Sequence, residues 1–239
     1  MIKKYIKNNY KIYKLLSNTR ERLRILYNTK ARSRYIWLLR DGDNKLTLDY
    51  PLNEESVVFD IGAYEGNFTE KINNKFRCHI FAFEPIDHSV KVLYKKFKNF
   101  PKVNIYSFGL SDKDKTVNIS DIGGASSIFK RPEGQPNKSI EVRSFINFVN
   151  ENEIKQIDLL YMNIEGSEYK LLNDIIDKGF IKYISHIQVQ FHNFIPNAKK
   201  ERKLIRKKLA NTHKCNFNYP FIWERWDLKI RPGDRKWGN

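Results

Sequence analysis

Long apolar runs are missing from this chain of 239 residues. A helix that crosses a membrane needs roughly eighteen or more consecutive, mostly apolar residues, and no stretch of the sequence approaches that length. The first residues, MIKKYIKNNYKIYKLL, interrupt their apolar pairs with Lys or Asn, so they lack the apolar segment of a signal peptide. We therefore expect a cytoplasmic protein.

Cysteine, glycine and proline are also scarce. The two cysteines, Cys78 and Cys215, lie far apart and match neither a disulfide framework nor the spacing of a zinc site. This favours a reducing compartment and argues against a structural metal. With 11 Gly, 8 Pro and 14% aromatic residues, the chain does not have the composition of a disordered protein. Its hydrophobic fraction of 41% can fill the core of one domain with short appendages.

Acidic residues are outnumbered, and the excess of basic residues is unevenly distributed. The net charge is +17, of which residues 1–40 contribute +11 and residues 199–239 contribute +9, so the stretch between them carries −3. Basic ends of this kind attract nucleotides, phosphorylated sugars, anionic lipid headgroups or nucleic acid without distinguishing among them. Solvated basic faces on a Lys-rich chain explain the same pattern equally well. The charge alone therefore names no partner.

The pattern of apolar residues divides the chain into two parts. Residues 2–29 place apolar side chains at loosely helical spacing, which predicts one or two amphipathic helices. Residues 35–50 read YIWLLRDGDNKLTLDY, where Asp-Gly between two apolar stretches predicts a β-hairpin. We assign residues 1–50 to a basic N-terminal part, with helices and a hairpin, and residues 51–239 to the domain that follows.

Apolar strands alternate with helices from residue 57 onwards. The expected strands are 57–60, 78–84, 103–108, 116–120, 157–164 and 184–191, and the expected helices follow Gly66 and cover 90–97 and 167–177. Nearly continuous apolar strands that alternate with helices predict an α/β fold, with a parallel sheet covered on both faces. Ligands of such sheets bind beyond the carboxyl ends of the strands.

The stretch VVFDIGAYEG, Val57–Gly66, runs from an apolar strand into an acid and a loop with two glycines. Gly62 permits a sharp turn and a close approach of the backbone to a ligand, and Gly66 permits close packing where a helix begins. Asp60 ends this strand, and Glu84 ends the next one, 24 residues later. A carboxylate at the second position commonly binds the hydroxyls of an adenosine ribose, so we expect an adenosine ligand.

The acids around this loop distinguish between adenosine cofactors. A dinucleotide favours G-x-G-x-x-G, whereas the glycines here are spaced as G-A-Y-E-G. Asp60 and Glu65 would repel a pyrophosphate but can face the ammonium and sulfonium groups of S-adenosylmethionine. The loop therefore predicts S-adenosylmethionine as cofactor, although by itself it also fits a tight structural turn.

Two later segments carry further signals. GLSD, Gly109–Asp112, follows the third expected strand, and by itself it also fits a simple Ser-Asp turn. DLLYMNIEGSEYKLL, Asp158–Leu172, is an apolar strand that ends in polar residues before a helix. Together with VVFDIGAYEG and FAFEP, this second segment resembles the FkbM-type family of S-adenosylmethionine-dependent methyltransferases, whose fourth-strand signature is similar to KIDxEGxE, so that three ordered motifs carry the resemblance. The resemblance covers about residues 55–195.

This resemblance implies a Rossmann-like class I methyltransferase fold, with a seven-stranded, mostly parallel sheet, an antiparallel edge hairpin and helices on both faces. It also implies O-methylation, commonly of sugars. The residues that match its cofactor site are Asp60, Gly62, Ala63 and Gly66 in the loop, Glu84 for the ribose, and Ser111 and Asp112 for the adenine region, where Asp112 would accept a hydrogen bond from the adenine amino group.

The fourth-strand signature both matches the family and departs from it. Glu165 and Gly166 match its invariant part, whereas Tyr161 and Asn163 stand where the family usually has Lys and Asp. An amide is a poorer ligand for a hard cation than a carboxylate, so we expect no metal at this site.

The last apolar strand ends in IQVQFH, which places His192 on the active-site side in this fold. A neutral imidazole near pH 7 suits the removal of a hydroxyl proton during methyl transfer. A histidine at a strand end is also commonly a hydrogen-bonded structural residue, and we interpret the other four histidines as structural or exposed. The candidate catalytic residues are His192, Glu165 and Asn163.

Two further stretches are candidates for the rim of the site. Residues 121–139 are rich in Gly, Ser and Pro, and they fit a substrate lid or a flexible surface insertion equally well. Lys130 and Arg131, together with the tail YPFIWERWDLKI, would suit a phosphorylated sugar. Within that tail we expect Trp223 and Trp226 to pack on the core rather than to stack on a sugar.

The sequence thus predicts an S-adenosylmethionine-dependent O-methyltransferase that acts on a sugar hydroxyl of a nucleotide sugar or a surface-polysaccharide precursor. The expected partner is a carbohydrate, anionic or linked to a nucleotide or lipid, with peripheral contact to an anionic membrane through the basic ends. A nucleic-acid methyltransferase would explain the charge, but the place of an Asn-Pro-Pro-aromatic motif reads NIEG. A non-catalytic module that binds membrane or RNA is the other alternative, although the acids that a cofactor needs are all present.

Overall fold

The computed structural model describes residues 19–120 and 137–229. Two helices open the described chain, α3 (Thr19–Tyr27) and α4 (Thr29–Leu39), and a short 3-10 helix, η1 (Leu46–Leu48), follows. Helices at this end were predicted from the apolar spacing, and the part of that prediction that covers residues 2–18 lies outside the described residues.

The β-hairpin predicted for residues 35–50 was wrong. Its first half belongs to α4, which begins where the side chain of Asn28 accepts a hydrogen bond from the backbone N–H of Ala31. The DGDN turn ends this helix, because Asp41 has a left-handed φ of 52° and Asp43 accepts a hydrogen bond from the indole of Trp37 at 2.9 Å. Trp37 is buried against the aromatic residues of the sheet edge, and this tertiary packing favours the helix.

A seven-stranded sheet forms the centre of the molecule, in the order β3-β2-β1-β7-β8-β10-β9. Its parallel strands are β1 (Val57–Ile61), β2 (His79–Phe83), β3 (Val103–Tyr106), β7 (Ile157–Met162) and β8 (Ile184–Val189). An antiparallel pair, β9 (His213–Tyr219) and β10 (Trp223–Leu228), closes one edge. This confirms the predicted mostly parallel sheet with an edge hairpin.

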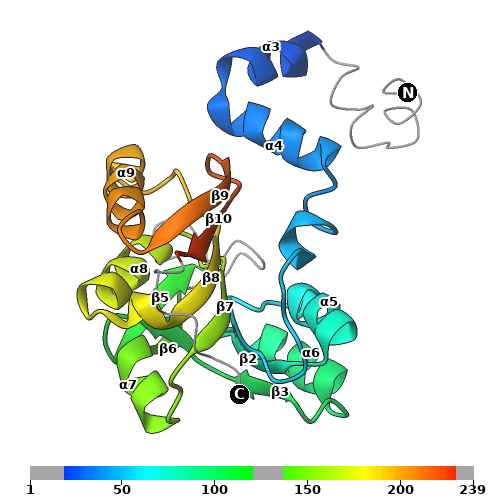
Figure 1. The fold of residues 1–239 in the computed structure, drawn as a ribbon, viewed down its shortest axis with the longest axis vertical. Coiled ribbons are helices and arrows are strands. Elements are labelled where there is room, and N and C mark those ends of the chain that lie inside the picture. The colour runs from blue at the N-terminus through cyan, green and yellow to red at the C-terminus, as the bar shows by residue number, and fades with distance from the viewer. Residues whose placement is uncertain (1–18, 121–136, 230–239) are drawn as a thin grey trace.

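Helices cover both faces of this sheet (Figure 1). On one face lie α5 (Asn67–Phe76) and α6 (Asp87–Phe97), and on the other lie α7 (Phe145–Glu151), α8 (Glu168–Asp177) and α9 (Ala198–Leu209). A 3-10 helix, η2 (Phe180–Tyr183), leads into β8. Side chains alternate between the two faces along each strand, so Val58 belongs to the core under α5 and α6, whereas Phe59 belongs to the core under α7 and α8.

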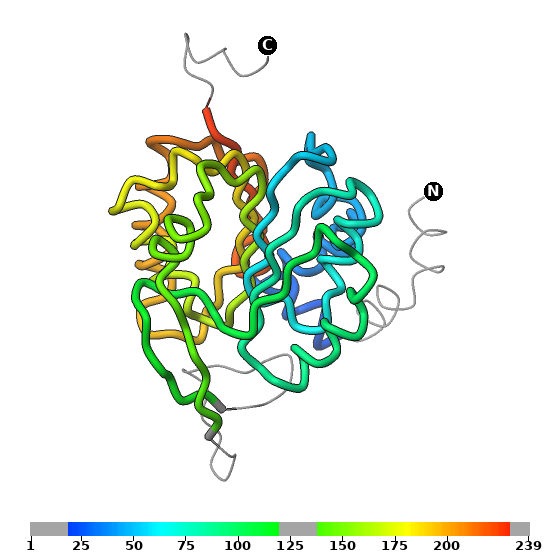
Figure 2. The backbone as a smooth tube through the Cα atoms, turned by 90° about the horizontal axis from the view of Figure 1, so that it is seen from below, coloured from blue at the N-terminus to red at the C-terminus, as the bar shows by residue number. Residues whose placement is uncertain are grey.

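A second, three-stranded sheet lies between β3 and β7 in the sequence. It consists of β4 (Gly109–Ser111), β5 (Lys115–Ser120) and β6 (Asn137–Ser144), in the order β4-β6-β5. Figure 2 shows β5 and β6, in green, extending from the body of the molecule as a ribbon. The sequence predicted β5 but not its pairing in a separate sheet with β4 and β6. The predicted lid, residues 121–139, lies outside the described residues except for its last three.

The C-terminal tryptophans confirm their predicted role. Trp223 and Trp226 are buried in two different hydrophobic clusters of the sheet edge. Within residues 19–120 and 137–229, every helix is too short or too polar to cross a bilayer.

Candidate active site

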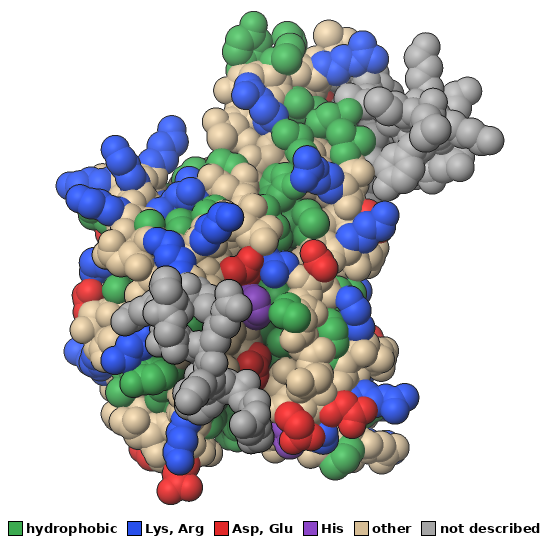
Figure 3. All heavy atoms as spheres, in the orientation of Figure 1, with side chains coloured by type: hydrophobic (Ala, Val, Ile, Leu, Met, Phe, Trp, Pro, Cys, Tyr) green, Lys and Arg blue, Asp and Glu red, His purple; other side chains and the backbone are tan. Residues whose placement is uncertain are grey.

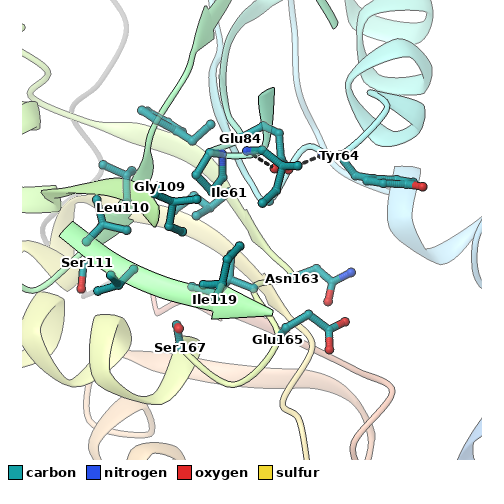
Figure 4. A pocket seen from close by; sticks show the side chains of 18 of the residues that line it. Ile61, Tyr64, Glu84, Gly109, Leu110, Ser111, Ile119, Asn163, Glu165 and Ser167 are labelled. Atoms are coloured by element: carbon teal, nitrogen blue, oxygen red, sulfur yellow. Dashed lines mark hydrogen bonds between the residues drawn. The ribbon is translucent and has the colours of Figure 1, made fainter. Parts of the chain in front are cut away.

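A cavity of about 280 Å³ lies beyond the carboxyl ends of β1, β2 and β7 (Figure 4). Its walls come from the loops that follow these strands, from the start of α8 and from the small sheet. The walls include five of the residues predicted from the sequence, namely Gly62, Glu84, Ser111, Asn163 and Glu165. The cavity therefore lies where ligands of parallel sheets bind.

The two glycines of the first loop are required by sterics. Gly62 has a φ of 87°, and a Cβ atom at this position would lie 2.3 Å from the carbonyl oxygen of Asn163 on the neighbouring strand connection. Gly66 has a φ of 76° just before α5, and a Cβ atom there would lie 2.4 Å from the ring of Phe97. The predicted close packing at Gly66 is confirmed. At Gly62 the loop after β1 lies against the backbone of the fourth-strand signature.

Glu84 is held in place by backbone amides. It follows β2 directly, and only 5% of its surface is exposed. One carboxylate oxygen, Oε2, accepts a hydrogen bond from the N–H of Tyr64, and the other, Oε1, accepts one from the N–H of Ile86, both at 2.9 Å. A fixed and buried carboxylate therefore faces the cavity.

Asp60 and Ala63 lie under the loop and are not on the cavity wall. Asp60 is buried, and its Oδ2 accepts a hydrogen bond of 2.6 Å from the hydroxyl of Thr69, whereas its Oδ1 has no hydrogen-bond partner among the described residues. Burial raises the pKa of Asp60 to about 7, and the charge of Glu84 adds to this rise while the Thr69 hydrogen bond opposes it. Ala63 is buried in the core under α5 and α6.

Asp112 is engaged in ion pairs, in contrast to the adenine contact expected from the sequence. Its Oδ1 accepts a hydrogen bond from the Ser111 hydroxyl at 2.8 Å and lies 3.2 Å from the ammonium of Lys115, and its Oδ2 lies 3.1 Å from Lys170. Burial raises the pKa of Asp112, but these partners outweigh it and hold that pKa well below its usual range. Ser111, not Asp112, is on the cavity wall.

The fourth-strand signature faces the cavity through Asn163 and Glu165. The backbone N–H of Asn163 continues the sheet by donating to Ile61, but its side-chain oxygen is buried without a hydrogen-bond partner among the described residues. Glu165 has a left-handed φ of 49°, an uncommon conformation for a side chain that bears a Cβ atom. Tyr161 points to the other face, where its ring stacks on Phe68 at a centroid distance of 3.5 Å.

His192 lies directly behind Glu165. Its Nε2 is 3.3 Å from Oε1 of Glu165, and its Nδ1 is 3.2 Å from Oε1 of Glu168. The histidine is buried and is not part of the cavity wall. Burial lowers the pKa of His192, but the hydrogen bonds and charges of the two glutamates outweigh it and raise the pKa to about 9.

This environment corrects the expected neutral imidazole at pH 7. With a pKa of about 9, the ring of His192 is mainly protonated at neutral pH. Glu168, which is fully buried, was not among the residues predicted from the sequence. The signal for it was the last acid of the stretch EGSE, Glu165–Glu168, which stands about one turn from Glu165 at the start of a helix. Two of the remaining histidines, His186 and His213, make side-chain hydrogen bonds elsewhere in the sheet, as expected for structural residues.

The apolar part of the cavity was also missed. Five side chains that line it come from the small sheet and the start of α6, namely Ile86, Val117, Ile119, Ile140 and Val142. The valine and isoleucine residues alternate along β5 and β6, which places them on one face of the ribbon. This alternation was visible in the sequence. The pairing of β6 with β4 and β5, which places the apolar face at the cavity, was not.

The cavity fits the adenosine cofactor that the sequence predicts. Its apolar wall suits a base, the fixed carboxylate of Glu84 suits two ribose hydroxyls, and the buried oxygen of Asn163 is an unused acceptor for an ammonium donor. The acidic character of this donor set suits a cation better than a pyrophosphate.

Solved structures of several methyltransferases are similar to the chain. Fibrillarin, a pre-rRNA processing protein of Methanococcus jannaschii, is 12% identical with a TM-score of 0.46, over 76% of this chain and 70% of that one. An rRNA methylase of Streptococcus thermophilus is 10% identical with a TM-score of 0.42, over 74% and 89%. TrmK of M. capricolum, in complex with S-adenosylhomocysteine, is 12% identical with a TM-score of 0.39, over 74% and 64%.

The sequence comparisons are more specific. No curated protein matches the chain. The Methyltransferase FkbM domain matches residues 60–219, which are 160 of the 239 residues and include the loop after β1, Glu84, the EGSE stretch and His192. The chain therefore belongs to the FkbM family of S-adenosylmethionine-dependent methyltransferases.

Proposed function

We propose that this methyltransferase acts on a hydroxyl group of a carbohydrate. The observation that carries the proposal is the pair of Glu165 and His192, which lies at the same cavity as the ribose-type carboxylate Glu84. A sugar hydroxyl must lose its proton as its oxygen is methylated, so its reaction gains from a proton acceptor at the cavity.

The residues of β1 and β2 would hold the cofactor. Glu84 would accept hydrogen bonds from the ribose hydroxyls, and the apolar residues of β5 and β6 would enclose the adenine. Asn163 would accept a hydrogen bond from the ammonium group through its buried side-chain oxygen. S-adenosylmethionine supplies an electrophilic methyl group on a sulfonium, so the protein has to position the acceptor and manage one proton.

The residues after β7 and β8 would manage that proton. Glu165 is the member of the pair on the cavity wall, so it would contact the acceptor hydroxyl. His192 would act through Glu165, because its Nε2 faces the Glu165 carboxylate and not the cavity. A group with a pKa of about 9 is a stronger base than an ordinary histidine once it is deprotonated, and this suits a hydroxyl, which is a weak acid.

Oxygen as the acceptor atom and sugar as the acceptor class are supported by the resemblance to the family, in which sugars are common acceptors. An anionic acceptor is supported by the surface of α9, the helix that begins six residues after His192. Lys199, Lys200, Lys203 and Lys207 are exposed on this helix at spacings that place them on one side. Figure 3 shows Lys and Arg side chains gathered at the position of α9.

These four lysines, called the α9 lysine face below, would attract the phosphate groups of a sugar linked to a nucleotide or a lipid. For a lipid-linked acceptor, the same charge would favour peripheral contact with an anionic membrane. RNA is the alternative polyanion that the α9 lysine face would suit. The EGSE stretch with its proton-accepting pair favours a hydroxyl acceptor, and in RNA that acceptor would be the ribose 2′-hydroxyl.

A two-part experiment tests the proposal. Calorimetry first measures whether the purified protein binds S-adenosylmethionine and whether Glu84→Gln weakens that binding. A methyl-transfer screen with labelled cofactor then compares sugar nucleotides, lipid-linked glycans and structured RNA. Transfer to a sugar hydroxyl is expected, and transfer to RNA alone, or to no class although the cofactor binds, would contradict the carbohydrate proposal.

A further inference from the structure

Glu168 is a fully buried carboxylate for which the proposed reaction has assigned no role. It is the first residue of α8, and its side chain has a relative exposure of 0%. Burial of a carboxylate is costly unless the group is paired and hydrogen-bonded. The groups that pair with Glu168 therefore identify the part of the structure that this buried carboxylate holds together.

Within residues 19–120 and 137–229, the hydrogen-bond partners of Glu168 belong to the candidate catalytic loops. Its Oε2 accepts a hydrogen bond of 2.8 Å from the N–H of Gly166, the residue after Glu165. Its Oε1 accepts one of 2.6 Å from the backbone N–H of His192 and lies 3.2 Å from Nδ1 of the same residue. The next residue on α8, Tyr169, donates its hydroxyl to the carbonyl of His192 at 2.6 Å. Glu168 thus joins the loop after β7 to the loop after β8.

This arrangement determines the direction in which the imidazole points. Because Nδ1 faces Glu168, Nε2 is the nitrogen turned toward Glu165, at 3.3 Å. The ring of Phe194 packs beside the imidazole at a centroid distance of 5.2 Å. The largest charges that act on the imidazole are those of Glu165 and Glu168. The three side chains form a line from the buried start of α8 to the cavity wall.

We propose that Glu168 is a positioning residue: its carboxylate holds the imidazole of His192 with Nε2 on Glu165, so that the glutamate on the cavity wall and the ring take up the proton of the acceptor as one unit. The inference rests on the proposed function, since it needs an acceptor that gives up a proton. In this unit the acceptor O–H bond breaks, the proton passes to the Glu165 carboxylate, and it comes to rest on Nε2 of His192.

The first test needs neither cofactor nor acceptor. Nuclear magnetic resonance of the full chain with ¹⁵N-labelled histidine follows the ring nitrogens of His192 between pH 5 and pH 10, and His192→Gln assigns the signals. We expect wild-type His192 to titrate near pH 9, and Glu168→Gln to lower this midpoint by about one unit or more, because one carboxylate charge is removed. A wild-type midpoint below pH 7 would overturn the proposal, and so would an unchanged midpoint in folded Glu168→Gln.

Further variants separate positioning from folding. Glu168→Gln turns an amide NH₂ toward the N–H of Gly166 and can weaken the loop, so Glu168→Asp and Glu165→Gln are measured beside it. Glu165→Gln removes a charge from the ring but leaves the Glu168 hydrogen bonds in place. It should lower the midpoint while the Nδ1–H signal stays protected from exchange with water. Loss of that protection in Glu165→Gln would show that Glu168 does not hold the ring.

Turnover provides the functional part of the test. The alkaline limb of the pH–rate profile should shift toward lower pH in Glu168→Gln, with partial return in Glu168→Asp and with unchanged affinity for S-adenosylmethionine. A titration midpoint that shifts while the pH–rate limb does not would refute the coupling of His192 to the acceptor proton. Failure of every carbohydrate to accept methyl would contradict the proposed function and leave the titration result standing.

Discussion

The two halves of the cavity are built in different ways. On the side of β1 and β2, backbone groups fix the important atoms, since amide N–H groups hold the Glu84 carboxylate and the loop passes β7 at Gly62 without a side chain. On the side of β7 and β8, side chains fix one another, since Glu168, His192 and Glu165 form a buried line. We call these the cofactor half and the proton half.

The difference predicts different responses to mutation. A side chain held by backbone amides can be replaced without displacing its neighbours far. Changes in the cofactor half should therefore affect the affinity for S-adenosylmethionine. In the proton half each group depends on the charge of the next, so one substitution changes the protonation of the others. Changes there should affect turnover and its pH dependence.

The largest expected effect separates the halves directly. His192→Gln should reduce turnover on the order of a hundredfold or more, since a positioned base contributes about 10² to 10⁴ in rate. Affinity for S-adenosylmethionine, measured by calorimetry, should not change. The wild-type rate should rise with pH through about 9, and this limb should be absent in the variant.

A histidine on β8, the strand that precedes His192, is the matched control. His186 also pairs with a carboxylate, that of Asp227 at 2.7 Å, but it lies in the body of β8 away from the cavity. His186→Gln should keep its turnover apart from effects of stability. Near-normal turnover in His192→Gln at saturating cofactor would make the proton half a structural element and leave positioning of the acceptor as the mechanism.

The pH dependence of stability should also differ between the halves. Asp60, beneath the cofactor half, has its folded-state pKa raised from 3.8 to about 7, so its neutral form is favoured in the folded protein. Its contribution is complete below pH 3.8 and is lost as the pH rises through 7, a change of about 4 kcal/mol if no other group compensates. Urea unfolding at pH 5 and pH 7.5 should therefore show a smaller loss of stability in Asp60→Asn than in the wild type.

His192 should affect the pH dependence of stability in a different pH range from Asp60. Its folded-state pKa is raised from 6.5 to about 9, so its contribution is complete below pH 6.5 and is lost as the pH rises through 9. His192→Gln should leave the slope below pH 6.5 as in the wild type and reduce it above. Identical slopes for the wild type and both variants would mean that neither buried group is perturbed in the way described.

The next effect concerns the cofactor half alone. Glu84→Ala should weaken S-adenosylmethionine binding by about 1.5 to 3 kcal/mol, the scale of hydrogen bonds to a charged group. Glu84→Gln keeps the size of the side chain and should lose less. The exposed Glu141→Ala is the control for a change of net charge. Unchanged affinity in folded Glu84→Ala, measured by calorimetry, would reject the ribose assignment.

The smallest effect tests the surface outside both halves. Replacement of the α9 lysine face by glutamine should weaken binding of an anionic acceptor by about tenfold at low salt, and the difference should shrink as salt rises, because exposed charges are screened. Turnover at saturating acceptor should persist. Lys91, Lys95 and Lys98, exposed on or next to α6, form a control set of similar charge. Equal salt-dependent losses for both sets would assign the effect to net charge rather than to α9.

The sequence by itself determined most of the central sheet, and it placed Gly62 and Glu84 at the cavity. The loop after β1, the acid after β2 and the EGSE stretch are each local signals, and their spacing along alternating strands and helices was enough to predict a parallel sheet with a ligand beyond its carboxyl ends. Their resemblance to one family also gave the antiparallel edge. Gly62 and Gly66 both have a positive φ, which glycine adopts readily, so the sequence carries the signal of these turns directly. The atoms that a Cβ would meet there, in Asn163 and Phe97, are brought close only by the fold.

Several features were decided by tertiary contacts. The DGDN stretch has the signal of a hairpin, but burial of Trp37 against the sheet edge makes it the end of a helix. Asp112 has the position of an adenine contact, but Lys170, which is 58 residues away in the sequence, engages its second oxygen. The apolar ribbon of β5 and β6 became a cavity wall because β6 pairs with both β4 and β5.

The protonation of His192 shows the physical reason most clearly. The residue type predicted a neutral base, because the ordinary pKa of histidine lies near neutrality. Two carboxylates from another loop and another helix, 27 and 24 residues earlier in the chain, reverse that expectation once the fold places them on the two ring nitrogens. Residue type and spacing determine which groups reach the edge of the sheet, but a pKa depends on charges within a few ångströms, and only the folded chain sets those distances.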